Sequence, residues 1–380
     1  MTPKPEDNCV WGKAAIISQE GDPTKVVKVY DVNLGELPQD KILVRSISSP
    51  VNPSDLSLIR GSYLAKKNNR IFKVKNPETG EEEEVCGFVG GNEGVGIVEK
   101  IGPKAGSAAN GSVSVGDWVV KVKGSDGLGS WMSYTIVDSD SILVIRNKDK
   151  ITPEHVITLK VNATTAYRML KDIVPLSQGD VVIQNGANSG AGQFLIQFAR
   201  MWGFKTINVI RDRPDFNEVA DSLFELGADA VVKDTELGDP KVISETLEKV
   251  GAPGGAKMAI NCVGGDVSML MVKYLSDRGT FVTYGAMTTE PISVPAPIFI
   301  FRNINFVGFW LAVWYSENPY SKWAEVWEEI LQMFREGKLV PQKMVPVPWY
   351  CNGSPLETSK IQQLVTDSMT AKSKVYFKFD

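Results

Sequence analysis

Short apolar segments alternate with helical patterns along the second half of this sequence, from about residue 162 to residue 309. Such alternation is typical of βαβ units and a parallel sheet. Six strands in this order predict an α/β fold with a doubly wound, Rossmann-type parallel sheet. The predicted strands are residues 180–184, 205–210, 230–233, 257–262, 280–284 and 305–309, and the predicted helices are residues 192–202, 215–226, 241–250 and 269–275.

The N-terminal part follows a different pattern, in which short β-like runs are separated by Gly, Pro, Asn and Ser. These runs are residues 13–18, 41–48, 95–101, 118–122 and 131–137, and they predict a compact β-rich unit. The polar segment 66–84, with four consecutive glutamates at its end, is predicted to be a mobile surface loop. The C-terminal part contains an amphipathic helix at 323–334 and a β-like run at 374–379, too little for a further domain. We therefore predict two domains, one comprising residues 1–161 and 314–380 and the other residues 162–313.

Composition excludes several classes of protein. The 380 residues carry 41 basic and 45 acidic side chains, and a net charge of −4 gives no electrostatic footprint for nucleic acid. No apolar run approaches the roughly 18 residues of a membrane-spanning helix, which predicts a soluble protein. The four cysteines are far apart, which argues against a disulfide framework and a cysteine-rich zinc site, and His155 is the only histidine. The N-terminal sequence has no arginine before Arg45 and lacks the pattern of a secretory signal or transit peptide.

A glycine-rich segment, residues 185–192, follows the first strand of the predicted sheet. Its spacing is G-x-x-x-G-x-G, with Gly186, Gly190 and Gly192. Glycines in such a turn let the backbone approach a pyrophosphate, whose charge is stabilised by the N-terminus of the following helix. A purely structural turn is the alternative, but the flanking strand and helix favour a dinucleotide site. Small residues also follow the fourth and fifth strands, at the sheet edge where this fold class binds ligands.

The second predicted strand ends in Arg211, Asp212 and Arg213. An NAD-specific site places an acidic residue near this position, and Asp212 lies 20 positions after Gly192. Guanidinium groups on both sides of it match the oxygens of a phosphate, so the pattern favours the 2′-phosphate of NADPH. A surface cluster of ion pairs is the alternative explanation.

Proton chemistry in the N-terminal unit has one prominent candidate. Asn92 and Glu93 stand where zinc-dependent alcohol dehydrogenases have His followed by Glu, and an amide is a poor zinc ligand, so no metal is predicted. Tyr63 follows a glycine turn, and a phenol with an ordinary pKa of about 10 is a hydrogen-bond donor or general acid at neutral pH. Core packing is the alternative for a tyrosine considered alone.

Seven motifs together closely resemble the mitochondrial trans-2-enoyl-thioester reductases, zinc-free members of the medium-chain dehydrogenase/reductase superfamily. The motifs are residues 51–55 (VNPSD), 61–63 (GSY), 91–95 (GNEGV), 165–170 (TAYRML), 207–214 (INVIRDRP), 261–265 (NCVGG) and 308–311 (GFWL). The resemblance extends over roughly residues 40–376. It implies that the β-rich unit is a GroES-like catalytic domain and that the enzyme reduces an enoyl thioester of acyl carrier protein or coenzyme A with NADPH. It also implies a mitochondrial matrix location and a homodimer.

The resemblance further implies roles for individual residues. Tyr63 matches the catalytic tyrosine, and Asn52 and Trp310 match the substrate pocket. Residues that match cofactor-binding positions are Asn162, Asn188, Ser189, Gly190, Ala191, Gly192, Arg211, Asp212, Arg213, Tyr284, Gly285, Ala286, Met287, Phe309, Trp310, Leu311 and Lys374. Ala286 departs from the usual Tyr-Gly-Gly-Met of the family.

The predicted reaction adds hydride to the β-carbon of the enoyl thioester and a proton to the α-carbon. The site must therefore stabilise an oxyanion and supply a proton, and Tyr63 can do either. Two alternatives remain open at this point: a zinc-free NADPH-dependent quinone or alkenal reductase, and a non-catalytic NADPH-binding protein.

Overall fold

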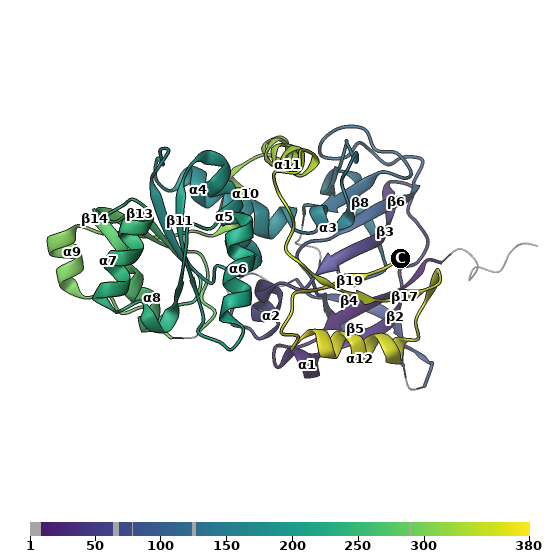
Figure 1. The fold of residues 1–380 in the computed structure, drawn as a ribbon. Coiled ribbons are helices and arrows are strands. Elements are labelled where there is room, and N and C mark those ends of the chain that lie inside the picture. Colours follow the sequence, from purple (N-terminus) through teal and green to yellow (C-terminus); the bar gives the residue numbers. More distant parts are fainter. Residues whose placement is uncertain (1–8, 64–67, 78, 124–126, 289) are drawn as a thin grey trace, which may run out of the picture. The chain divides into compact units, whose positions relative to one another are not determined.

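The computed structural model describes residues 9–63, 68–77, 79–123, 127–288 and 290–380 (Figure 1). The chain divides into two compact units. Unit 1 comprises Met1–Thr158, Tyr320–Leu331 and Lys343–Asp380, and unit 2 comprises Leu159–Pro319 and Gln332–Gln342.

Unit 2 is built on a parallel six-stranded sheet with the order β12-β11-β10-β13-β14-β15. Strands β11, β13 and β14 of this sheet are labelled in Figure 1. The doubly wound sheet predicted from the sequence is thus confirmed. The strands are β10 (Val181–Asn185), β11 (Lys205–Ile210), β12 (Ala230–Lys233), β13 (Ala256–Asn261), β14 (Leu275–Thr283) and β15 (Asn305–Gly308). The helices are α4 (Thr164–Asp172), α5 (Gly190–Trp202), α6 (Phe216–Leu226), α7 (Pro240–Lys249), α8 (Gly265–Met269), α9 (Ala296–Arg302) and α10 (Leu311–Glu317).

Helices cover both faces of this sheet. On one face Ile183 and Val209 belong to a buried apolar cluster with Leu247 of α7, and on the other Ile210 clusters with Ile196 of α5. Because the central strands are buried on both faces, most of their residues are apolar, although buried polar residues such as Gln184 and Asn208 interrupt the pattern. All five residues of β10 are buried.

The helix predicted at 269–275 is wrong in its extent. The chain forms the short helix α8 and then a 3₁₀ turn at Leu270–Tyr274, and β14 begins at Leu275. Met271 and Tyr274 are fully buried. The apolar residues in this segment are therefore explained by packing in the core, and they do not form one face of a longer helix.

Unit 1 contains a closed barrel, β1-β2-β4-β5, and a seven-stranded sheet in which β16-β19-β3-β6-β7-β9 form the path and β8 pairs with β3. The barrel strands are β1 (Trp11–Ile17), β2 (Val27–Asn33), β4 (Arg70–Lys75) and β5 (Glu82–Val89). The sheet strands are β3 (Lys41–Pro50), β6 (Val95–Ile101), β7 (Trp118–Lys121), β8 (Tyr134–Asp138), β9 (Ile142–Val144), β16 (Val345–Pro348) and β19 (Val375–Lys378). The remaining elements are α1 (Pro23–Val26), α2 (Pro53–Ile59), α3 (Pro153–Val156), α12 (Thr358–Ser368), β17 (Tyr350–Cys351), β18 (Ser354–Pro355) and α11 (Tyr320–Arg335), which ends in unit 2.

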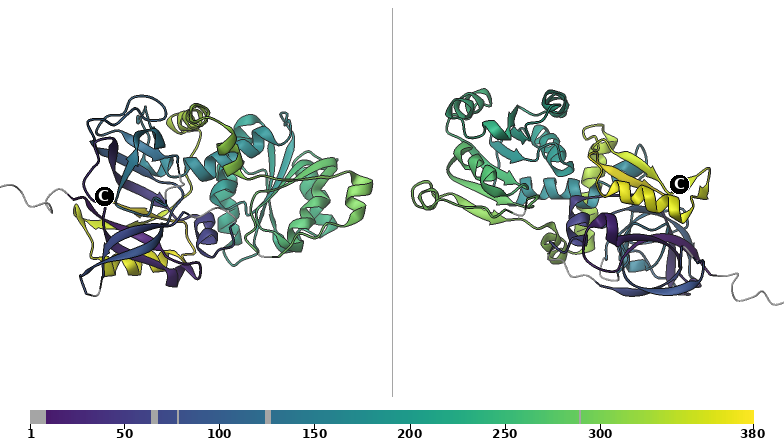
Figure 2. Two further views of the ribbon diagram at one scale, coloured as in Figure 1. Left: turned by 180° about the vertical axis from the view of Figure 1, so that it is seen from behind. Right: turned by 90° about the horizontal axis from the view of Figure 1, so that it is seen from below.

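The C-terminal segment lies with the N-terminal strands in all views (Figure 2). Strand β19 pairs antiparallel with β3, and Phe377 of β19 is fully buried with its ring 5.4 Å from that of Trp131. Helix α12 lies along β2, where the Gln362 side chain accepts from the Val29 amide and donates to the Val27 carbonyl. The C-terminal residues therefore contribute to the core of unit 1.

The loop predicted at 66–84 is wrong for the part that the structure describes. Residues 66, 67 and 78 lie outside the described residues, but β4 and β5 pair as an antiparallel hairpin across most of the segment. Phe72 and Val74 point into the core, while Lys73 pairs in register with Glu84 and Lys75 with Glu82. Opposite charges on facing strands offset each other, so the polar sequence is compatible with a strand pair.

No helix among the described residues has the length and apolar character needed to cross a membrane.

Candidate active site

The carboxyl ends of β10 and β13 in unit 2 are tied together by buried amide groups. The Asn185 side chain donates to Asn261 Oδ1 (2.7 Å) and to Ser268 Oγ (3.1 Å), and its oxygen accepts from the Cys262 amide (2.8 Å). Asn261 Oδ1 also accepts from the amides of residues 263 and 264. This network holds the loops after both strands in place at the edge where ligands bind in this fold class.

The glycine-rich segment turns directly into α5, which begins at Gly190, two residues before the predicted start. Ser189 caps the helix by accepting from the Gly192 amide (3.2 Å). A Cβ atom on Gly192 would lie 2.6 Å from the Ala187 carbonyl oxygen, and one on Gly190 would lie 2.8 Å from Asn162 Oδ1. Both glycines therefore allow the turn to pack closely against Ala187 and Asn162. Glycines have this packing role in dinucleotide-binding turns, in which the helix N-terminus binds the pyrophosphate.

The end of β11 carries the three charged residues that favour NADPH. All three are exposed. Arg213 binds Asp215 with both arms of its guanidinium, with Nη2 2.6 Å from Oδ2. Asp212 Oδ1 lies 3.3 Å from Lys233 Nζ. Among the described residues Arg211 has no ion-pair partner, so its guanidinium is available to an anion.

The loops after β14 and β15 lie beside those already described. The Tyr284 amide donates to the Asn261 carbonyl and the Met287 amide to that of Cys262, while the Phe309 amide donates to Thr283. Burial of the Tyr284 hydroxyl, and secondly the neighbouring Cys262, raises its pKa well above the ordinary value. This hydroxyl therefore stays protonated as a hydrogen-bonding group.

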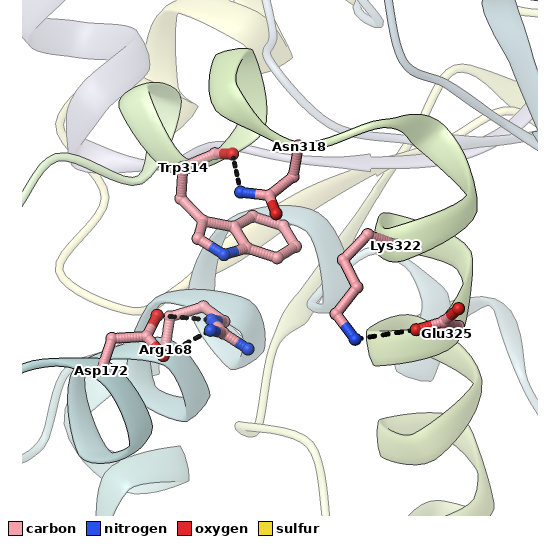
Figure 3. A network of polar contacts seen from close by, with 6 residues as sticks. All are labelled: Arg168, Asp172, Trp314, Asn318, Lys322 and Glu325. Carbon is pink, nitrogen blue, oxygen red and sulfur yellow. Dashed lines mark hydrogen bonds and ion pairs between the residues drawn. The ribbon is translucent and has the colours of Figure 1, made fainter. Parts of the chain in front are cut away.

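Helix α10, which begins at Leu311, is attached to α4 (Figure 3). The guanidinium of Arg168 forms an ion pair with Asp172 on its own helix and lies 4.9 Å from the centre of the Trp314 ring. Asn318 donates to the Trp314 carbonyl (2.8 Å), and Tyr315 donates to the Lys160 carbonyl (2.5 Å). These contacts anchor the segment that follows Phe309 and Trp310. Figure 3 also shows the Lys322–Glu325 ion pair within α11.

Unit 1 holds a cluster of charged and amide side chains, hereafter the buried charge cluster: Asn52, Asp55, Asn92, Glu93 and Lys374. Asn52, Asp55 and Glu93 are each no more than 2% exposed. Asn52 Nδ2 donates to Glu93 Oε1 (2.7 Å) and Asn92 Nδ2 to Asp55 Oδ1 (2.6 Å). Lys374 donates to Asn52 Oδ1 and to the Val51 carbonyl (2.8 Å). One ammonium group thus shares a buried site with two carboxyl groups.

Burial shifts the pKa values of Asp55 and Lys374 in the directions that favour the neutral form of each group. Desolvation raises the pKa of Asp55 to about 6, against the opposing effects of the Asn52 amide and Lys374. Desolvation lowers the pKa of Lys374 to about 8, against the attraction of Glu93 and Asp55. The cluster therefore depends on mutual compensation of its charges.

Tyr63 follows helix α2, which begins at Pro53 in the VNPSD motif. Asn52 precedes the helix, and its backbone amide donates to Asp55 Oδ2 (2.8 Å). The helix ends in a turn at Gly61, whose φ is +75° and where a Cβ atom would collide with Glu20. Tyr63 is half-buried two residues later. The buried start of α2 thus fixes the position of Asn52 and the direction of the chain that leads to Tyr63.

The residues of unit 1 do not fit a zinc ion. The Asn92 amide donates its hydrogen to Asp55 and offers no ring nitrogen, and His155 lies in α3, where its Nδ1 accepts from the Thr152 amide. The described part of the chain contains no group of three His, Cys, Asp or Glu side chains that could hold a metal.

The structure brings the predicted site residues together in two sets. In unit 2 each group of predicted cofactor residues follows the carboxyl end of a strand: residues 188–192 follow β10, 211–213 follow β11, 284–287 follow β14 and 309–311 follow β15. Asn162 lies next to Gly190 in the first of these groups. In unit 1, Asn52 contacts Lys374 directly, and Tyr63 follows the same helix. The sequence prediction missed the roles of Asn185, Asn261 and Asp55, although each stands at the end of a strand or the start of a helix, where buried polar groups cap backbone.

Curated proteins similar to this chain share one name. Enoyl-[acyl-carrier-protein] reductase, mitochondrial, from Xenopus tropicalis is 34% identical over 332 residues, which cover 87% of this chain and 86% of that protein. The proteins of that name from Homo sapiens (34%; 91% and 85% covered) and Arabidopsis thaliana (37%; 86% and 79% covered) are similar to the same extent. The chain belongs to the mitochondrial enoyl-[acyl-carrier-protein] reductase family. The resemblance stated from the motifs is confirmed.

Solved structures agree with membership of the enoyl-[acyl-carrier-protein] reductase family. The mitochondrial 2-enoyl thioester reductase Etr1p/Etr2p heterodimer from Candida tropicalis has a TM-score of 0.82 at 29% identity, covering 97% of this chain and 100% of that one. The Etr1p/NADP/crotonyl-CoA complex has the same TM-score at 30% identity, with the same coverage. Two family models match as well: "Alcohol dehydrogenase GroES-like domain" over residues 38–147 and "Zinc-binding dehydrogenase" over residues 190–332.

Proposed function

We propose that this enzyme reduces the trans-2 double bond of enoyl thioesters carried by acyl carrier protein or coenzyme A, with NADPH as reductant. The observation that carries this function is the match over most of the chain to curated mitochondrial enoyl-[acyl-carrier-protein] reductases. A relative solved with NADP and crotonyl-CoA supports the cofactor and the substrate class. The relatives' names support a mitochondrial location.

The proposed site residues divide the work between binding and proton transfer. Asn162 and residues 188–192 would hold the pyrophosphate end of the cofactor, residues 211–213 the 2′-phosphate, and residues 284–287, 309–311 and Lys374 the remainder. We propose residues 162–313 as the cofactor domain and residues 1–161 with 314–380 as the catalytic domain. Asn52 and Trp310 would contribute to the substrate pocket.

When bound, NADPH supplies the hydride that adds to the β-carbon of the enoyl thioester. Negative charge then develops on the thioester oxygen, and the α-carbon requires a proton. The Tyr63 hydroxyl would donate a hydrogen bond to that oxygen or a proton to that carbon. The buried charge cluster would hold α2, and with it the chain leading to Tyr63, in one place.

An absorbance assay of NADPH consumption tests the proposal. We expect rapid consumption with crotonyl-CoA, much slower consumption when NADH replaces NADPH, and little with quinones or free alkenals. Faster turnover of a quinone or alkenal would identify the enzyme as a reductase of that class. Tight NADPH binding without reduction of any of these compounds would indicate a non-catalytic binding protein.

We also propose a homodimer formed through the β15 edge of unit 2. Strand β15 is the last strand of its sheet, and beside it α9 exposes Phe299 (48%), Ile300 (69%) and Phe301 (78%). An unpaired strand edge with exposed apolar side chains favours association with another chain. A second copy is the proposed occupant, since a relative is solved as a heterodimer of two related reductases.

Phe301→Glu is expected to convert this dimer to a monomer, because a buried unpaired carboxylate opposes association. Sedimentation velocity measures the change. Phe224→Glu is the matched control, since Phe224 is also exposed (41%) but lies on α6. A monomeric wild type, or a Phe301→Glu variant that remains dimeric, would contradict the proposed interface.

A further inference from the structure

Lys233 is the last residue of β12 and lies beside the end of β11. The two strands are parallel, and their register places Lys233 level with Ile210, the residue before Arg211. Both strands therefore deliver charged side chains to the same carboxyl edge. Lys233 was not among the cofactor residues predicted from the sequence.

Two residues of the segment that begins at Lys233 bind the carboxylate oxygens of Asp212. Lys233 Nζ lies 3.3 Å from Oδ1, and the Thr235 hydroxyl donates to Oδ2 at 3.3 Å. The Asp212 amide donates to Asp234 Oδ1 at 2.9 Å, which fixes the backbone at this point. In an NAD site the corresponding acid accepts from the ribose 2′-hydroxyl. Here both of its oxygens already have protein partners.

The charge around this edge is net negative, and Lys233 halves the excess of anions. Residues 211–215 and 233–236 carry three cations against four anions, a balance of −1, and without Lys233 two against four would leave −2. Arg213 is committed to Asp215, and Arg211 is the remaining guanidinium. A second cation is therefore needed to offset Asp212 beside a dianionic 2′-phosphate.

We propose that Lys233 is a specificity-determining residue for the phosphorylated cofactor, because it neutralises Asp212 and adds a cation beside Arg211 at the 2′-phosphate subsite. This inference rests on the proposed use of NADPH. The Phe216 ring, 5.2 Å from Lys233 Nζ, helps to hold the ammonium at this edge. A simple surface ion pair between Lys233 and Asp212 would have no effect on cofactor choice.

Calorimetric binding of NADP⁺ and NAD⁺ tests the role without depending on turnover. We expect Lys233→Gln to weaken NADP⁺ binding by about tenfold and to leave NAD⁺ binding within about twofold, as loss of one charge-assisted contact to the phosphate implies. Lys233→Arg should retain most of the NADP⁺ affinity. Adding Asp212→Asn to Lys233→Gln should recover part of the loss, since the acid no longer repels the phosphate.

Lys257→Gln is the matched control. Lys257 also forms an ion pair, with Asp180 at 2.9 Å, but it lies at the amino end of β13, on the opposite edge of the sheet. We expect it to change neither affinity. Equal effects of Lys233→Gln on both cofactors, or none, would overturn the role of Lys233, as would a wild type that binds both cofactors equally. Failure of the wild type to reduce any enoyl thioester would instead contradict the proposed function. The effect of Lys233 on NADP⁺ affinity would not be affected by that result.

Discussion

Tyr63→Phe is expected to lower kcat with crotonyl-CoA by roughly 10²–10⁴-fold, the usual contribution of a positioned acid. The change removes one hydroxyl group and keeps the ring. The half-buried position of Tyr63 after the Gly61 turn should therefore be preserved. NADPH binding should be unchanged, because the proposed cofactor residues lie mainly in unit 2. Stopped-flow absorbance measures turnover, and fluorescence titration measures NADPH affinity.

Tyr350→Phe is the control for loss of a phenol from unit 1. Tyr350 is also half-buried, in the short strand β17, and we expect normal turnover after its substitution. If Tyr63→Phe retains near-normal turnover, Tyr63 is neither the proton donor nor the group that stabilises the oxyanion. Loss of NADPH affinity in the same variant would indicate a structural role for the hydroxyl.

Lys374→Met is expected to destabilise the protein by about 3 kcal/mol or more at pH 7, since removing the ammonium leaves the buried carboxyl groups of Asp55 and Glu93 without a compensating charge. The substitution leaves Asp55 and Glu93 buried without a cation and removes the donor to Asn52 and Val51. Urea unfolding measures the change. Lys378→Met is the control: Lys378 ends β19, the strand that begins directly after Lys374, and its loss removes an exposed pair with Asp380 at 3.5 Å, which should have little effect.

The Lys374→Met deficit should be smaller at pH 5 than at pH 7, where Lys374 is still charged in the wild type. The pKa of Asp55 is raised from 3.8 to about 6. A carboxyl with a raised pKa contributes stability that is complete below its unfolded pKa and is lost as the pH rises through its folded pKa. Without Lys374, which lowers the pKa of Asp55, the folded pKa of Asp55 rises further and more stability is lost by pH 7. Adding Glu93→Gln should recover part of the loss. A deficit that does not depend on pH would mean that Lys374 stabilises unit 1 by packing and not by charge.

The sheet of unit 2 was predictable to within a few residues at most strand ends. Strands 205–210 and 230–233 have the predicted bounds. A strand buried on both faces is mostly apolar, and this pattern is visible without knowledge of its neighbours. The β4–β5 hairpin was not predictable in this way, because its lysines and glutamates offset each other only after the two strands pair. Locally they resemble a solvated charge run.

In the proposed site, too, features that depend on sequence neighbours were predictable, and contacts between residues far apart in the chain were not. The glycine-rich turn, the Arg211–Asp212–Arg213 triplet and the position of Tyr63 depend on neighbours in the chain, so periodicity and motif spacing were enough to find them. Contact of Lys374 with Asn52 joins residues 322 positions apart, and that of Lys233 with Asp212 depends on the register of β11 and β12. Such contacts follow from strand pairing across the whole chain, which no local pattern records. Local composition thus accounts for where a cofactor and a phenol belong, while the packed fold determines which charges neutralise one another around them.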